Sequence, residues 1–196
     1  MNPFIWGPDV WNFLFSISVR CSATNFNDVV LLFRQLEFVL PCRSCRHSLT
    51  TIRRKIRHSI DPRKPESTTE WLWVVHDMVN QNLGKQSVSL HEVLMKHAKI
   101  SELTSDSFIM DMLCIFANAM SKSKARIMVD HIQTVSRLTR VAFPWFKAPD
   151  CLDAQHWVAN MGLEEIAHTL FTCHCNFYGA TSRPVLSFPA WVGHYT

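Results

Sequence analysis

Glycine is scarce in this chain, with five in 196 residues and no Asn-Gly or Asp-Gly pair. Tight β-hairpins rely on such pairs because their turns need positive φ, so a hairpin-rich fold is not expected. Long apolar runs are also missing. The longest, FIMDMLCIFANAM at 108–120, is interrupted by Asp111 and falls short of the roughly 18 residues of a membrane helix. We therefore predict a mostly helical chain without a transmembrane span.

The sequence also has little charge and no leader-like start. Charged residues make up 18% of the chain against 47% hydrophobic, with seven Trp and 13 Phe, which predicts a globular protein with an aromatic core. The opening MNPFIWGPDVW has neither a basic nor an apolar signal region, so we expect residence in the cytoplasm. The net charge is only +4, and the basic stretch at 53–64 is interpreted as a solvated helix face. Neither nucleic acid nor membrane is expected as a partner.

Apolar spacing of three and four residues predicts a succession of helices. The first is expected to start at Pro8 and Asp9, because proline and an acid suit the first turn. The others are predicted over Asn27–Leu40, from Cys42 to about Ser59, from a capping box at Ser67–Glu70 to Gly84, over Leu90–Ala98, and over 106–121 and 122–142. The polar segment KISELTSD suggests two domains, residues 1–100 and 101–196, and the second has no recognisable catalytic pattern.

Seven cysteines are present, and two of them form the motif PCRSCR at 41–46. At a helix start, Cys42 and Cys45 lie one turn apart on one face, within disulfide reach. Free backbone N–H groups, the helix dipole, Arg43 and Arg46 favour the thiolate that thiol–disulfide exchange requires. In a thioredoxin-like domain the motif would follow a β-strand, and no strand pattern precedes Pro41. A zinc site that adds His47, His58 or the pair Cys173 and Cys175 stays open on spacing alone.

The predicted fourth helix carries two polar side chains on an apolar stripe. Trp73, His76, Asn80 and Leu83 share one side at spacings of three and four. Buried polar groups need partners, which a cofactor ring or ribose would supply; the alternative is a core histidine bonded to a backbone carbonyl.

Three segments together resemble the Erv/ALR family of FAD-linked sulfhydryl oxidases. They contain Gly7 and Trp11, then Pro41, Cys42 and Cys45, then Trp71, His76, Asn80, Leu83 and Lys85, with the family's order and spacing. The resemblance covers roughly residues 4–100. It implies an all-α fold, a four-helix bundle plus a short fifth helix that holds FAD between helices, followed here by an additional helical region.

The resemblance also implies a set of roles. Cys42 is the sulfur attacked by thiols of a protein substrate, and Cys45 faces the flavin, from which molecular oxygen takes electrons to give hydrogen peroxide. A homodimer is implied as well. The implied cofactor-binding residues are Gly7, Trp11, Phe15, Cys45, Trp71, His76, Asn80, Leu83 and Lys85. Lys85, and less directly the stretch from Arg53 to Arg57, would neutralise the FAD pyrophosphate.

The sequence departs from the family pattern at two points. Phe15 stands where a histidine is common, and no cysteine lies between Cys45 and Cys114, so the usual second cysteine pair is missing. In lacking this second pair, the chain resembles the compact viral members of the family, which act in the cytoplasm.

The remaining cysteines carry weaker predictions. Cys173 and Cys175, in TCHCN, are candidates for a shuttle disulfide, or else buried thiols or metal ligands with His168 and His174. Cys21, Cys114 and Cys151 are interpreted as core cysteines. The alternative function is a zinc-binding interaction module built on the CxxC and CxC cysteines.

Overall fold

The computed structural model describes residues 3–40, 42–56, 60–61, 63–98, 125–142, 166, 168–169 and 171–172. Within these ranges the longer elements are all helices, which confirms the predicted all-α class. They are α1 (Pro3–Val19), α2 (Phe26–Val39), α3 (Arg43–Lys55), α4 (Ser67–Asn82), α5 (Leu90–Ala98) and α7 (Ala125–Ala142). Of these six, none is long and apolar enough to cross a membrane.

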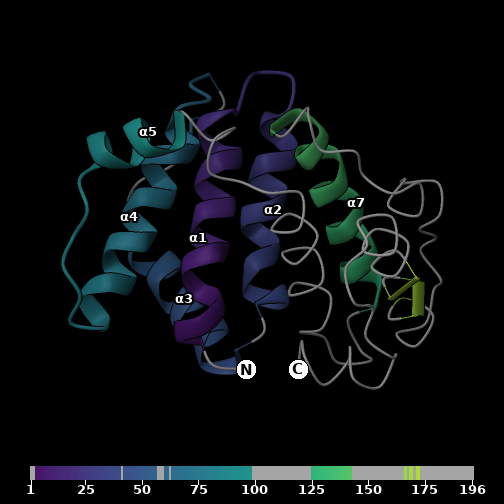
Figure 1. Cartoon of the computed structure of the whole chain (residues 1–196), viewed down its shortest axis with the longest axis horizontal. Coiled ribbons are helices and arrows are strands. Elements are labelled where there is room, and N and C mark those ends of the chain that lie inside the picture. The colour runs from purple at the N-terminus through teal and green to yellow at the C-terminus, as the bar shows by residue number, and fades with distance from the viewer. Residues whose placement is uncertain are drawn as a thin grey trace, which may run out of the picture.

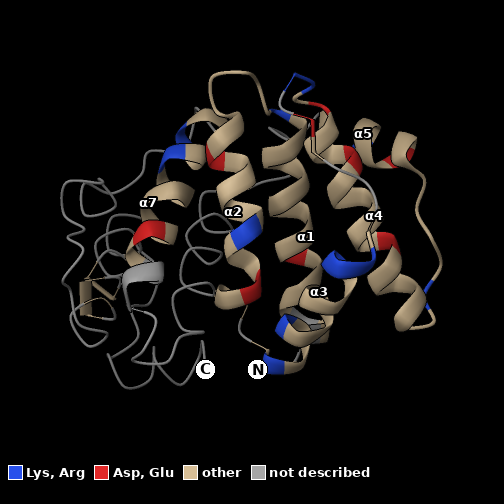
Figure 2. Cartoon of the chain, turned by 180° about the vertical axis from the view of Figure 1, so that it is seen from behind, with Lys and Arg blue, Asp and Glu red and all other residues tan. Residues whose placement is uncertain are grey.

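Helix α1 lies in the middle of the bundle (Figure 1). It packs against α4 and α5 on one side, while α2 contacts α3 and, over its outer face, α7. Asp9 is the only acidic or basic residue of α1 (Figure 2), as suits a helix surrounded by others. The core is aromatic-rich as predicted, and its most deeply buried large side chains are Phe13, Leu14, Ile17, Leu32, Phe33, Ile52 and Leu72.

Helix α1 begins earlier than predicted. It starts at Pro3 and contains Pro8, so the assignment of Pro8 to the first turn was wrong. A proline removes one hydrogen bond and crowds the carbonyl four residues before it. Here that residue is Phe4, in the opening turn, so a single bond is lost close to the helix end. Trp6, in the added turn, is buried in the core and offsets this cost.

The ends of α3 and α4 follow different signals from those expected. Helix α3 ends at Lys55 because Ile56 is extended, although we predicted about Ser59, a residue outside the described ranges. The capping box at the start of α4 is wrong, since Ser67 is itself helical and its hydroxyl bonds the backbone of Asp61. Gly84 ends the helix as predicted, with a φ of 64° that suits glycine.

Two other helices confirm the sequence pattern closely. Helix α2 differs from its prediction by one residue at each end, and α5 agrees with it. Helix α7 lies within the predicted 122–142. The helix expected over 106–121 falls outside the described residues, and the division at residue 100 stays a prediction.

Candidate active site

The PCRSCR motif caps helix α3. Cys42 is the N-cap residue in an extended conformation, and its Sγ accepts a hydrogen bond from the backbone N–H of Cys45 at 3.2 Å. The two cysteines form a disulfide, with Cα atoms 5.1 Å apart, as side chains one turn apart at a helix start allow. The predicted pair is therefore present at the predicted place, while Pro41 lies outside the described residues.

The two sulfur-bearing residues have different surroundings. Cys45 lines a cavity of about 660 Å³, and Cys42 does not. Cys42 is half-buried, and its neighbour Arg43 is exposed. One end of the disulfide therefore lines the cavity, and the other lies outside it, next to an exposed residue.

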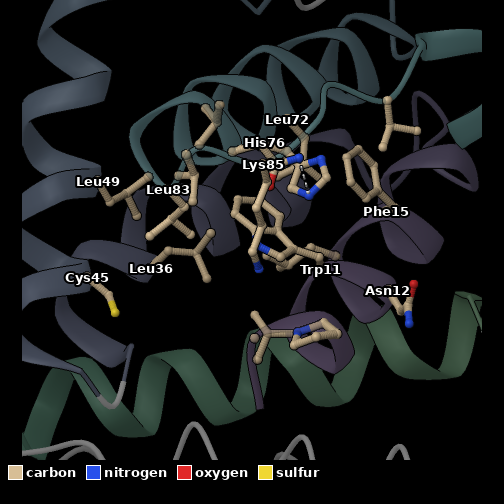
Figure 3. A pocket seen from close by; sticks show the side chains of 18 of the residues that line it. Trp11, Asn12, Phe15, Leu36, Cys45, Leu49, Leu72, His76, Leu83 and Lys85 are labelled. Carbon is tan, nitrogen blue, oxygen red and sulfur yellow. Dashed lines mark hydrogen bonds between the residues drawn. The ribbon is translucent and has the colours of Figure 1, made fainter. Parts of the chain in front are cut away.

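The cavity is lined by residues of α1, α2, α3, α4 and α5, and its volume lies in the range typical of small-molecule and cofactor sites. Each of the nine residues predicted to bind a cofactor lines it, including Cys45 (Figure 3). The structure thus brings together, from three segments of the chain, Gly7, Trp11, Phe15, Cys45, Trp71, His76, Asn80, Leu83 and Lys85.

Two other residues named from the sequence do not line the cavity. Trp73 was predicted on the same side of α4 as His76, and its indole N–H donates to the carbonyl of Val88, a cavity residue, at 2.6 Å. Arg53 was considered for the pyrophosphate, but it pairs with Glu37 at 3.0 Å, away from the cavity. Arg57 lies outside the described residues.

His76 sits in an aromatic cluster on the cavity wall. Its ring centroid lies 4.7 Å from that of Trp11 and 5.5 Å from that of Phe15, the latter edge to face. The amide nitrogen of Asn80 is 3.4 Å from Nε2. An amide N–H can only donate, so Nε2 accepts and the ring proton is on Nδ1. Burial lowers the pKa of His76, which favours this neutral form.

Two lysines bring positive charge to the cavity. The Gly84 turn lets the backbone N–H of Lys85 donate to the carbonyl of Asn80 at 2.9 Å, and the Lys85 ammonium lies 5.3 Å from the ring centre of Phe4. Lys96, on α5, donates to the side-chain oxygen of Asn12 at 2.9 Å. A pyrophosphate in this cavity would therefore meet cationic side chains.

Sequence reasoning missed His97 of α5, which also lines the cavity. It is only 3% exposed, and its ring stacks on Phe15 with centroids 5.5 Å apart. The sequence does hold one signal for it. Val93 lies four residues earlier and is buried as well, so the spacing puts both residues on the inward side of a short helix.

The chemistry of these groups fits a flavin dinucleotide. Aromatic faces suit stacking on flat rings, histidine and asparagine offer hydrogen bonds, and lysines suit a diphosphate. Gly7 leaves open space at the wall, because a Cβ added there would meet no atom within 4 Å.

The zinc alternative finds no support in the part of the chain that the structure describes. No group of three or more His, Cys, Asp or Glu residues there could hold a metal ion. His58, Cys173, His174 and Cys175 lie outside that part. Cys21, predicted to be a core cysteine, is a half-buried free thiol that packs against the core. Cys114 and Cys151 lie outside the described part.

These features define a helical domain in which one end of a CxxC disulfide faces a cofactor-sized cavity. Comparison with protein families agrees: residues 8–99 match the model of the Erv1 / Alr family. This part of the chain, which contains the disulfide and the cavity, therefore belongs to the Erv/ALR family. Members of the family are generally sulfhydryl oxidases and typically bind FAD. No curated protein and no solved structure matches the chain significantly.

Proposed function

We propose that this protein is an FAD-dependent sulfhydryl oxidase that forms disulfides in protein dithiols and passes the electrons to molecular oxygen. The observation that carries the proposal is the asymmetry of the disulfide, in which Cys45 lines the cavity and Cys42 does not. An oxidase of this kind needs one sulfur that substrate can reach and one that meets the cofactor.

The thiol steps follow from this arrangement. A substrate thiolate attacks Sγ of Cys42, the Cys42–Cys45 bond breaks, and Cys45 leaves as a thiolate. A second substrate thiolate then attacks the substrate sulfur of the mixed disulfide and releases Cys42. The substrate gains a disulfide, and the CxxC pair holds the two electrons as a dithiol. FAD, when bound, supplies the two-electron acceptor that reoxidises the pair and is itself reoxidised by oxygen, giving hydrogen peroxide.

The start of α3 favours the charges that these steps create. Leaving sulfurs depart more readily as stable thiolates, and the free N–H groups and dipole of a helix N-terminus stabilise negative charge. The backbone N–H of Cys45 already points at Sγ of Cys42, at 3.2 Å. The same donor stabilises Cys42 when it is released in the second step.

The remaining cavity residues would hold the cofactor. Trp11, His76 and Phe15 offer ring faces and edges, and Lys85 offers a positive charge for the diphosphate. A homodimer, the cytoplasmic location and a shuttle role for Cys173 and Cys175 accompany this proposal as predictions.

The decisive experiment measures visible absorbance and thiol-driven oxygen consumption on purified protein, with dithiothreitol as the substrate. We expect yellow wild-type protein that consumes oxygen and a Cys45→Ala variant that is yellow but inactive. Cys21→Ala is the matched control, because it removes a free thiol outside the cavity, and it should keep the wild-type rate.

Other outcomes would point elsewhere. Colourless wild-type protein that contains zinc would refute the oxidase and support the binding module. Yellow wild-type protein that consumes no oxygen would indicate a redox-inactive protein that keeps the fold.

A further inference from the structure

His97 has a defined protonation state because of its contact with α1. Its Nδ1 lies 3.3 Å from the hydroxyl oxygen of Ser16. That hydroxyl donates its only hydrogen to the carbonyl of Asn12, so its oxygen is left to accept. The ring proton of His97 must therefore be on Nδ1, and Nε2 carries a lone pair.

The surroundings keep His97 neutral. Burial lowers its pKa to about 4, and the nearby charges of Lys96 and Arg20 act in the same direction. At neutral pH the ring thus has one donor, used by Ser16, and one acceptor. Among the described residues, no hydrogen bond to Nε2 of His97 is found, and Nε2 is not one of the fully buried atoms that lack a partner. This acceptor is therefore open to the cavity that His97 lines, where a donor of a bound ligand can satisfy it.

The position of His97 in the cavity indicates which half of FAD would lie next to it. Electron transfer from Cys45 requires the flavin ring at the α3 side of the cavity. In Figure 3, Cys45 and Phe15 lie at opposite sides of the cavity, with Lys85 between them in this view. His97 stacks on Phe15, so it is on the side away from the sulfur. The adenosine half of the dinucleotide would reach it.

We propose that His97 is a cofactor-binding residue whose Nε2 accepts a hydrogen bond from the adenosine half of FAD. This inference rests on the proposed function. Adenosine carries suitable donors on its 6-amino group and its two ribose hydroxyls. His76 complements His97, because its Nδ1 bears a proton whereas Nε2 of His97 does not. Both histidine rings contact Phe15 and both residues line the cavity, so they give its wall one donor and one acceptor.

The first test compares FAD dissociation constants of wild-type protein and a His97→Phe variant, measured by ultrafiltration after removal of bound flavin. Phenylalanine keeps the ring stacked on Phe15 but lacks the acceptor. We expect the dissociation constant to rise about five- to tenfold, the range for one lost hydrogen bond. His97→Gln, whose amide oxygen can accept, should recover part of the loss. His91→Phe is the control, because His91 is exposed on the same helix and outside the cavity.

The second test separates recognition from mere stability and needs no substitution. Three FAD analogues are titrated into wild-type protein: one with a keto oxygen in place of the 6-amino group, one 2′-deoxy and one 3′-deoxy. One of them should bind about five- to tenfold more weakly than FAD, which identifies the donor. In His97→Phe that difference should disappear.

The outcomes distinguish the two proposals. If wild-type protein binds FAD and His97→Phe binds it equally well, the role of His97 is refuted and the oxidase stands. The same holds if all three analogues bind wild-type protein as tightly as FAD, even if His97→Phe does not fold. If wild-type protein binds no FAD, both proposals fail together.

Discussion

Polar side chains have different surroundings on the two sides of α1 and α2. On the α4–α5 side, His76, His97 and Asn80 line a cavity. On the other side, α7 packs along α2, and two of its polar side chains bond across the helix contact: His131 bonds Gln35 at 3.0 Å, and Arg137 bonds Asp28 at 2.7 Å. The first set faces the cavity that we propose holds the cofactor, and the second joins α7 to α2.

His97 and His131 make this comparison direct. Both rings are almost fully buried, and in both Nδ1 is hydrogen-bonded to an oxygen. Burial lowers both pKa values, to about 4 for His97 and about 3 for His131. The oxygen of Gln35 is a carbonyl, so His131 also carries its proton on Nδ1. Only His97 lines the cavity, so a cofactor should affect the titration of His97 alone.

Acid should produce the largest effect. Because both folded-state pKa values lie below the ordinary 6.5, the unfolded chain binds protons first as the pH falls from 6.5. The free energy of unfolding is then lost between pH 6.5 and the folded values near 4 and 3, at about 1.4 kcal/mol per pH unit for each histidine. We expect a loss of several kcal/mol by pH 4, measured by urea unfolding.

The two histidines can be separated in the same experiment. His131→Leu should roughly halve the slope between pH 4 and 6. Saturating FAD should extend the remaining loss to below pH 4, because the proposed hydrogen bond requires neutral His97 and so lowers its pKa further. A pH dependence below pH 5 that FAD leaves unchanged, with FAD shown to bind at each pH, would contradict the contrast between the two sites.

A substitution of Gln35 should have a smaller effect, confined to the α7 side. Gln35→Leu leaves the buried N–H of His131 without its acceptor, which costs about 1–3 kcal/mol of unfolding free energy. The double variant with His131→Leu should recover part of this, because both polar groups are then removed. FAD affinity should stay unchanged in each, and a marked loss would show that the two sides are coupled.

Local patterns were sufficient for much of the site. Cys42 and Cys45 begin a helix because Pro41 ends the previous pattern, and Gly84 ends α4 because its φ of 64° suits glycine. The spacing from His76 to Asn80 places both on one face whatever surrounds the helix. The family pattern then indicated which cavity these residues would share.

Tertiary packing decided what the sequence could not predict. Trp71 and Trp73 are both aromatic residues on α4, but only Trp71 turns inward, where it stacks on Phe33 with centroids 5.4 Å apart. The role of His97 depends on Ser16, 81 residues earlier. Such pairs follow from how α5 lies on α1, which periodicity within either helix does not specify.

The ion pair between Arg137 and Asp28 should matter least. It is bidentate, with distances of 2.7 and 3.1 Å, and the Asp28 carboxylate raises the pKa of Arg137. However, the Arg137 side chain is 46% exposed, and pairs in such surroundings contribute about 0–1 kcal/mol. Arg137→Ala should therefore lower the free energy of unfolding by less than Gln35→Leu does, and by less still in high salt. A larger loss that salt does not reduce would mean that Arg137 attaches α7 through packing of its apolar stem, so that this side, too, depends on shape more than on charge.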